Sequence, residues 1–135
     1  MFYKTTSLDL YSGRPAEANE YLYQVIQCVS LEKLFSELEE ETFKTAHEIV
    51  NTPTTSLPHF GILGYGVDHG VALNHGRIGA AEGPDAFRSC IGKLAHPNNK
   101  NIKITDFGSV YCPDKKLALA QQRLGSALAH LLAQG

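Results

Sequence analysis

The clearest hydrophobic pattern in the chain is a short apolar run at residues 60–65, which is bounded by glycine. The run is too short for a helix and fits a buried strand. Gly83, Pro84 and Asp85 begin a helix further on, because proline suits the first helical turn and a carboxylate there favours the positive end of the helix dipole. The pattern therefore predicts a strand, a long glycine-rich loop over residues 66–82 and a helix over residues 84–95.

A second strand and helix follow in the same order. Alternating apolar and polar positions predict a strand over residues 102–107, near a sheet edge and closed by Gly108. A helix is predicted over residues 113–134, with four leucines at helical spacing on one face, namely Leu117, Leu124, Leu128 and Leu131. The order of strand, helix, strand and helix is that of a parallel sheet with right-handed crossovers.

Helical spacing also predicts two helices in the N-terminal part. One covers residues 16–29 after a turn at residues 11–15. The other begins at the N-cap Ser30, and its apolar face is formed by Leu31, Leu34, Phe35 and Leu38. We therefore expect a single partial domain over residues 1–135, with an N-terminal helical segment (1–56) and a strand–helix–strand–helix unit (57–135).

The predicted fold class is α/β, with a small parallel sheet and flanking helices. Parallel sheets are found with several strands and with both faces covered, and two strands are too few for this. The pattern ends on a helix where a further strand is expected, so we expect the sheet to be incomplete.

Composition and charge narrow the possible functions. Hydrophobic residues make up 43% of the chain and charged residues 19%, as in ordinary globular proteins. The formal net charge of −2 offers no basic surface for nucleic acid. No apolar stretch approaches the roughly 20 residues that span a bilayer, and the N-terminus lacks an apolar signal core. We therefore expect a cytoplasmic protein with neither a nucleic-acid nor a membrane partner.

The three cysteines, Cys28, Cys90 and Cys112, are far apart in the sequence and odd in number. They also lack the CxxC spacing of many zinc sites and redox motifs. This pattern predicts reduced, buried thiols, and neither a disulfide nor a zinc site.

Residues 66–82 are the predicted place for chemistry, because ligands of parallel sheets bind at the carboxyl ends of the strands. One interpretation of the polar residues is a divalent metal site, formed by Asp68, His69 and His75 with Asp106 from the second strand. Their spacing matches no self-sufficient ligand motif. The alternative is that these side chains tie the loop down through hydrogen bonds to its own backbone.

Other candidate sites have weaker support. Residues 61–66 contain glycines, but these lie inside the predicted strand and no GK[ST] motif follows, so a phosphate-binding loop is not predicted. Cys90 lies in a predicted helix and nothing places a base beside it. Arg88 either binds an anion or pairs with a neighbouring carboxylate. Arg77 lies in the loop, where an arginine can hold a carboxylate through two hydrogen bonds.

Four segments of this central region carry a family resemblance. They are residues 61–64, Asp68-x-Gly70-Val71, Asn74-x-Gly76-Arg77-x-Gly79-Ala80 and Gly83-Pro84-Asp85-Ala86-x-Arg88. Supporting matches are Tyr11-x-Gly13-Arg14, Thr105-Asp106-x-Gly108-x-Val110 and the helix from Gln121 to Gly135. Together they resemble the N-terminal region of formimidoylglutamase, a member of the arginase and agmatinase superfamily.

The resemblance implies a three-layer α/β/α fold and hydrolysis by a hydroxide that bridges two manganese ions. The family's metal ligands come from GGxH, DxHxD and DxD segments, and none of these occurs in this sequence. We therefore expect no catalytic residue, no metal ligand and no cofactor in this chain. Asn74 and Arg77 match a substrate-facing wall. His69 stands where an acidic residue is expected, and residues 72–73 stand where basic residues are common.

The leading hypothesis is a truncated formimidoylglutamase-like protein that is inactive alone. The full-length family hydrolyses N-formimidoyl-glutamate to glutamate and formamide in histidine degradation. The alternative is an interaction module or half-enzyme whose open sheet edge pairs with a second copy, as a homo-oligomer, or with a complementary C-terminal chain. A third hypothesis is a rebuilt single-metal site at the loop histidines and aspartates.

Overall fold

The computed structural model describes residues 1–35, 58–96 and 102–133. The strands are β1 (Tyr3–Lys4), β2 (Ile26–Cys28), β3 (His59–Gly66) and β4 (Lys103–Tyr111). The α-helices with defined bounds are α2 (His69–Leu73), α3 (Gly83–Ile91) and α4 (Leu117–Ala133). Short 3-10 helices lie at Leu8–Leu10, Leu22–Gln24, Ala80–Glu82 and Pro113–Lys115. The α/β fold class is confirmed, and none of the described helices is both long and apolar enough to cross a bilayer.

The four strands form one mixed sheet around β4. β3 runs parallel along one side of β4, from His59 opposite Lys103 to Gly66 opposite Tyr111. The other side of β4 is shared by β2, which is parallel, and β1, which is antiparallel. The expectation of a parallel sheet therefore holds for β2 and β3 but not for β1.

The predicted edge position of the 102–107 strand is wrong. β4 has neighbours on both sides, and Thr105 and Asp106 are 2% and 0% exposed. The side chains of Thr105 and Asp106, two of the polar positions that suggested a solvent-facing edge, are instead hydrogen-bonded inside the protein, as buried polar groups must be. β4 also continues through Gly108 to Tyr111, because Gly108 adopts a positive φ of 83° that lets the strand go on without a side-chain clash.

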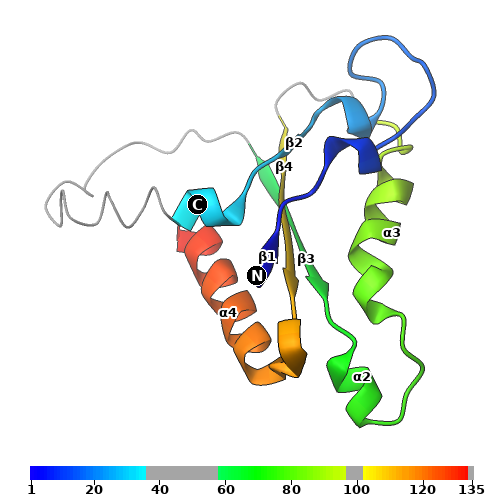
Figure 1. Cartoon of the computed structure of the whole chain (residues 1–135). Coiled ribbons are helices and arrows are strands. Elements are labelled where there is room, and N and C mark those ends of the chain that lie inside the picture. The colour runs from blue at the N-terminus through cyan, green and yellow to red at the C-terminus, as the bar shows by residue number, and fades with distance from the viewer. Residues whose placement is uncertain (36–57, 97–101, 134–135) are drawn as a thin grey trace, which may run out of the picture.

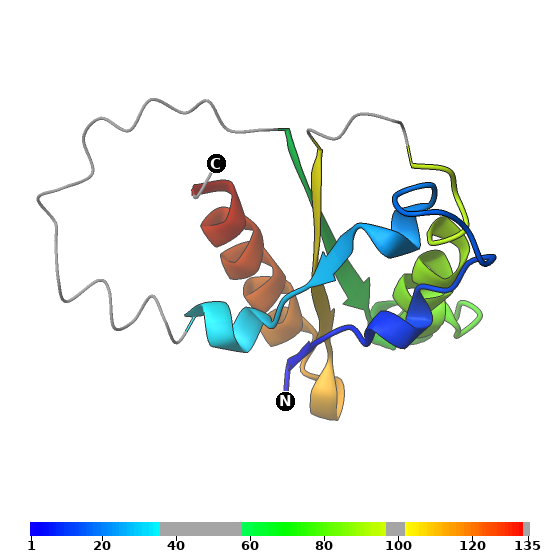
Figure 2. The same ribbon diagram turned by 90° about the horizontal axis from the view of Figure 1, so that it is seen from above.

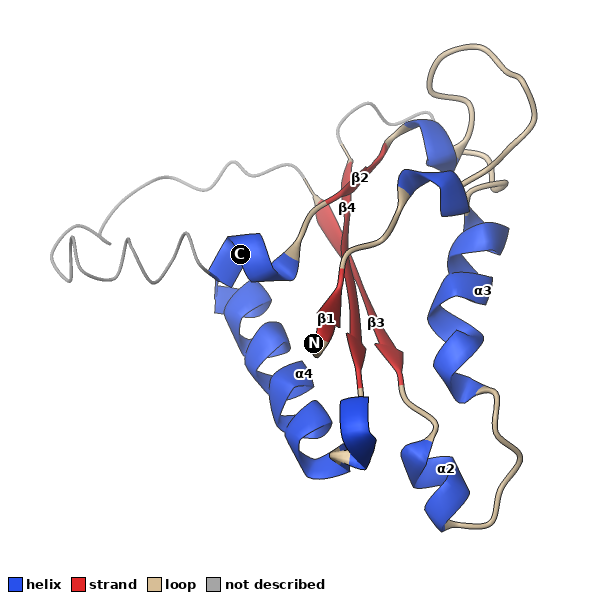
Figure 3. Ribbon diagram, in the orientation of Figure 1, coloured by secondary structure: helices blue, strands red, loops and turns tan. Residues whose placement is uncertain are grey.

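Helices lie on both faces of the sheet. Figure 1 shows α4 on one side and α3 on the other, and the view from above in Figure 2 shows the same arrangement. On the α4 side, Leu31, Phe107 and Ala127 form a buried cluster. Figure 3 shows the strands lying between α4 and α3.

The helix predicted over residues 16–29 is wrong. A 3-10 helix occupies Leu22–Gln24, and residues 26–28 form β2. The amide of Leu22 donates to the carbonyl of Leu94 at 3.0 Å, and Ile26 lies opposite Ile104 of β4. Pairing with distant segments satisfies this backbone, so tertiary contacts override the local helical spacing, and the β-branched Val25 and Ile26 suit a strand.

The N-cap predicted at Ser30 is confirmed. Its Oγ accepts a hydrogen bond from the Lys33 amide at 3.4 Å, and the Leu34 amide donates to the Ser30 carbonyl at 3.0 Å. Residues 31–35 are helical, with Leu31 buried. Leu38, the rest of this predicted helix and the linker at residues 51–56 lie outside the described residues.

The two C-terminal helices differ in detail from their predictions. α3 begins at Gly83 with Pro84 in its first turn, as predicted, but ends at Ile91 and not at residue 95. α4 begins at Leu117 after a separate 3-10 turn. Its fully buried residues are Ala120 and Ala127, whereas Leu128 is 44% exposed, so the predicted leucine face is only partly correct. Ala127 packs in the buried cluster with Leu31 and Phe107, so a small side chain occupies this part of the buried helix face.

Candidate functional site

The carboxyl ends of β3 and β4 meet at one edge of the sheet, because the two strands are parallel and end at Gly66 and Tyr111. The segments that follow them line a cavity of about 310 Å³. Its ionisable side chains include Asp68, His69 and Lys115. The loop over residues 66–82 leaves this edge, which is where open parallel sheets bind ligands.

Asp68 closes this loop. Its Oδ1 accepts hydrogen bonds from the amides of Gly79, at 3.2 Å, and Ala81, at 2.7 Å. The intervening chain contains the short helix α2, where a loop alone was predicted. The alternative interpretation of the loop's polar residues is therefore confirmed for Asp68, whose carboxylate ties the loop to its own backbone.

Asn74 and Arg77, the predicted substrate-side residues, are both exposed in this loop. Asn74 ends α2, and its Nδ2 donates to the Gly70 carbonyl at 3.1 Å, so part of its hydrogen-bonding capacity already serves the loop. The next residue, His75, adopts a positive φ of 56°. The role of Asn74 and Arg77 toward a substrate stays a prediction.

The metal set that included Asp106 is not assembled. Asp106 lies opposite Ile62 in the middle of the sheet and is engaged by other groups, while Asp68 holds the loop. Within residues 1–35, 58–96 and 102–133, no group of three or more His, Cys, Asp or Glu side chains is placed to hold a metal ion.

The strongest polar constellation is a buried ion pair between Arg88 of α3 and Asp106 of β4, which are 1% and 0% exposed. The Arg88 Nε donates to Asp106 Oδ2 at 2.6 Å, and Nη2 donates to Asp106 Oδ1 at 2.9 Å. This two-pronged geometry is the strongest form of an arginine–carboxylate pair. Of the two predicted roles for Arg88, pairing with a neighbouring carboxylate is confirmed.

The remaining donors of Arg88 are also satisfied. Its Nη1 donates to Ser109 Oγ at 2.7 Å and to Asp85 Oδ1 at 3.2 Å, and Nη2 donates to the Gly108 carbonyl at 2.7 Å. A guanidinium has five N–H donors, and every one of them has an acceptor here. Arg88 therefore joins α3 to β4, and its guanidinium has no N–H donor left to bind an anion.

Asp106 is equally well supplied with donors. Besides Arg88, it accepts hydrogen bonds from the Tyr11 hydroxyl and, at 2.7 Å, from the Gly108 amide. Burial raises the pKa of Tyr11 above its usual range, and the hydrogen bond and charge of Asp106 raise it further. Burial alone lowers the pKa of Arg88, but Asp106 and Tyr11 outweigh this effect and raise it. The network thus holds a neutral tyrosine beside a charged pair.

Sequence reasoning did not bring Tyr11 and Ser109 into this network. The available signal was Asp106 beside the apolar Phe107 in a predicted strand, since a carboxylate buried there needs donors. Tyr11 is 95 residues from Asp106 in the sequence, so no local spacing identifies it.

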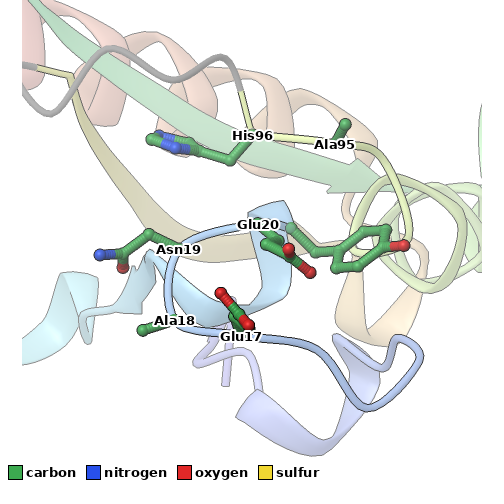
Figure 4. Close-up of a pocket in the computed structure, with 7 residues that line it drawn as sticks. Glu17, Ala18, Asn19, Glu20, Ala95 and His96 are labelled. Carbon is green, nitrogen blue, oxygen red and sulfur yellow. The ribbon is translucent and has the colours of Figure 1, made fainter.

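A second cavity, of about 510 Å³, lies between residues 17–21 and the segment after α3 (Figure 4). Glu17 and Glu20 bring carboxylates to it, and His96 forms part of the facing wall. The His96 amide donates to the Glu20 carbonyl at 2.7 Å, which joins the two walls. Within the described part of the chain, neither ring nitrogen of His96 has a hydrogen-bond partner.

All three cysteines are free thiols. Cys28 and Cys112 are half-buried, but Cys90 is exposed on α3, so the prediction of buried thiols is wrong for Cys90. Burial raises the pKa of the Cys28 thiol, and the Asp106 charge raises it further.

Comparison with known proteins shows similarity to formimidoylglutamases. The chain is 41% identical over 99 residues to a formimidoylglutamase of Chromobacterium violaceum, which covers 72% of this chain and 31% of that protein. It is 34% identical over 132 residues to a formimidoylglutamase of Staphylococcus aureus strain JH9, which covers 97% of this chain and 38% of that protein. No family model and no solved structure matches the chain.

The longer of the two alignments, over 132 residues, includes nearly all of the strands and helices described above. The chain spans about a third of the length of the curated relatives it matches. This chain is therefore homologous to formimidoylglutamases over most of its own length, and over only about a third of theirs.

Proposed function

We propose that this chain forms the N-terminal part of a formimidoylglutamase-like hydrolase, with an incomplete three-layer fold of the arginase type. The observation that carries the proposal is the 34% identity over 97% of the chain to a formimidoylglutamase. The sheet with helices on both faces and the loop at the carboxyl ends of its parallel strands support it (Figure 1).

The reaction proposed for the complete protein is hydrolysis of N-formimidoyl-glutamate to glutamate and formamide. In the family that the sequence resembles, two manganese ions supply the bridging hydroxide for this reaction. The GGxH, DxHxD and DxD ligand segments do not occur in the sequence. The described residues do not fit such a metal pair. We therefore assign this chain a part of the substrate wall and derive no hydrolytic step from it alone.

The purified chain is expected to release no formamide from N-formimidoyl-glutamate, with or without added Mn²⁺, because it lacks the family's ligand segments. The measurement is formamide release over time, with the Staphylococcus aureus formimidoylglutamase as the active control in the same assay. Manganese-dependent formamide release by this chain would show that its own side chains hold the metal, and the proposal of inactivity would fall.

Arg77 is proposed to hold a substrate carboxylate and Asn74 to contact the same substrate. Both side chains are exposed in the loop that leaves the ligand edge, and an arginine can bind a carboxylate through two parallel hydrogen bonds. A hydrogen bond to a charged group contributes about 1.5–3 kcal/mol, which corresponds to roughly a 10- to 100-fold change in binding.

Arg77→Ala tests this role in a chimera in which this chain replaces the matching segment of the Staphylococcus aureus enzyme. We expect KM for N-formimidoyl-glutamate to rise about 10- to 100-fold, with a smaller effect on kcat, because the clamp binds the substrate in both the ground state and the transition state. Arg14→Ala is the matched control, because Arg14 is also exposed but lies at another cavity. An unchanged KM in the Arg77 variant would remove Arg77 from the site.

A second proposed function is that of an interaction module. Among the described residues, β3 pairs with β4 on one side only, which leaves its other side open to a further strand. An exposed strand edge is a template for pairing with another chain. The partner is either a second copy or a complementary chain that corresponds to the unmatched part of the relatives.

A further inference from the structure

The side chain of Asp68 contacts the far end of its loop and not the helix that it precedes. An aspartate directly before a helix commonly accepts hydrogen bonds from the first amides of that helix. The backbone of Asp68 is not extended as in such a cap, and its side chain makes no cap hydrogen bond to α2. The carboxylate reaches instead to the amides of Gly79 and Ala81, which lie 11 and 13 residues further along the chain.

Two sets of contacts hold the loop on either side of Arg77. Before it, the Gly76 amide donates to the Val71 carbonyl at 2.9 Å, and a Cβ at Gly76 would lie 2.9 Å from Val71 Cγ1. After it, Asp68 Oδ1 accepts a hydrogen bond from the Gly79 amide at 3.2 Å. Figure 1 shows this part of the loop between α2 and α3. Arg77 therefore lies between close packing against α2 and a single carboxylate.

Little else in the described part of the chain holds the segment after Arg77. Arg77 and Ile78 lie in no helix or strand, and neither forms a backbone–backbone hydrogen bond with the other described residues. Ile78 is 65% exposed, so burial of its side chain contributes little. A Cβ at Gly79 would meet no atom within 4 Å, so close packing does not hold this position either. The hydrogen bonds to Asp68 are therefore the main contacts that fix this segment.

We propose that Asp68 is a positioning residue for Arg77, and that its carboxylate holds the loop so that the guanidinium meets a substrate carboxylate in one orientation. The inference rests on the substrate role proposed above for Arg77. Two parallel hydrogen bonds form only when both donors are aligned at once, so binding depends on how well the loop is ordered beforehand. A loop that presents Arg77 correctly for only about a tenth of the time weakens apparent binding about 10-fold.

The chemistry of the acceptor predicts a graded response to substitution. Hydrogen bonds to an ionised carboxylate are roughly twice as strong as those between neutral groups. Asp68→Asn keeps a side-chain oxygen that can accept from the same amides, whereas Asp68→Ala removes the acceptor. Loss of the charge alone would act in the opposite direction, because a carboxylate repels an anionic substrate. We therefore expect substrate binding to weaken in the order Asp, Asn, Ala.

The first measurement is the backbone order parameter of Arg77, from NMR relaxation of the whole chain. We expect about 0.85 in the unmodified chain, below about 0.6 in Asp68→Ala and an intermediate value in Asp68→Asn. Glu82→Ala is the matched control, because Glu82 is exposed in the same loop and its side chain makes no cap hydrogen bond to α3. Circular dichroism establishes that each variant is folded. Equal order of Arg77 in all four proteins would overturn the inference.

The second measurement is KM for N-formimidoyl-glutamate in the chimera described above. We expect Asp68→Ala to raise KM about 10-fold with a smaller effect on kcat, Asp68→Asn to raise it less, and Glu82→Ala to leave it unchanged. Since Asp68 acts through Arg77, Asp68→Ala is expected to have no further effect on KM in a chimera that already carries Arg77→Ala.

The double variant separates this inference from the function on which it rests. If Arg77→Ala raises KM and Asp68→Ala does not, Asp68 is no positioning residue, but the substrate role of Arg77 stands. Effects that multiply in the double variant would also overturn the inference, because they would show that Asp68 acts independently of Arg77. An unchanged KM in Arg77→Ala would overturn both the substrate role of Arg77 and the inference.

Discussion

Replacement of Arg88 by methionine is expected to lower the free energy of unfolding by about 3–5 kcal/mol. The substitution keeps much of the side-chain volume but leaves the Asp106 carboxylate buried without its counter-ion, and the Ser109 and Gly108 acceptors without a donor. Since natural domains have only about 5–15 kcal/mol of stability, this is a large fraction of the total. Urea unfolding followed by circular dichroism measures the change.

Two further variants make this prediction specific. Arg77→Met removes an exposed arginine and is expected to change stability by no more than about 0.5 kcal/mol. Arg88→Met combined with Asp106→Leu removes both charges, so it is expected to recover part of the loss, because a buried pair replaced by apolar groups leaves no unpaired ion. Equal stability of Arg88→Met and the unmodified chain would show that the ion pair contributes nothing to the fold.

Replacement of Gly108 by alanine is expected to lower the free energy of unfolding by about 2–4 kcal/mol. Gly108 has a φ of 83°, a conformation that costs a residue with a side chain roughly 1–2 kcal/mol. A Cβ at this position would also overlap the Lys4 carbonyl oxygen and lie 3.2 Å from the Thr5 Cα. β1 would have to move away from β4, and the Asp106 bond to the Gly108 amide would be disturbed with it.

The matched control for Gly108 is Gly125→Ala in α4. A Cβ at Gly125 meets no atom within 4 Å, and alanine is the better helix former. This variant is expected to stabilise the protein by about 0.5–1 kcal/mol. Thermal unfolding of the two variants should therefore shift in opposite directions. A stabilised Gly108→Ala protein would contradict the strained approach of β1 to β4.

The local signals in the sequence were reliable where the chain's own neighbours decide the structure. The strand at residues 60–65, the helix start at Pro84 and the N-cap at Ser30 were predicted and are present. Each depends on contacts within a few residues, such as the bond from the Lys33 amide to Ser30 Oγ. The same holds for Asp68, whose bonds stay within the loop that it closes.

Predictions failed where distant segments compete for the same backbone. Residues 26–28 have helical spacing, but they gain a ladder along β4 that a helix cannot make. Apolar side chains are usually buried and charged ones exposed, but Phe87 is 54% exposed and Arg88 is buried. Arg88 is buried because Asp106, 18 residues further along the chain, and residues close to Asp106 accept the hydrogen bonds of its guanidinium.

The features of the candidate site also divide into those that the sequence determined and those that only the tertiary structure decided. The sequence by itself determined the homology, the loop at the ligand edge and the absence of the family's ligand segments, because these are properties of residue order. Only the tertiary structure decided that β4 lies at the centre of the sheet and that Arg88 joins α3 to β4 through a buried ion pair. The physical reason is that strand pairing and ion pairing join residues far apart in the chain, and these contacts leave no signal in the spacing of neighbouring residues.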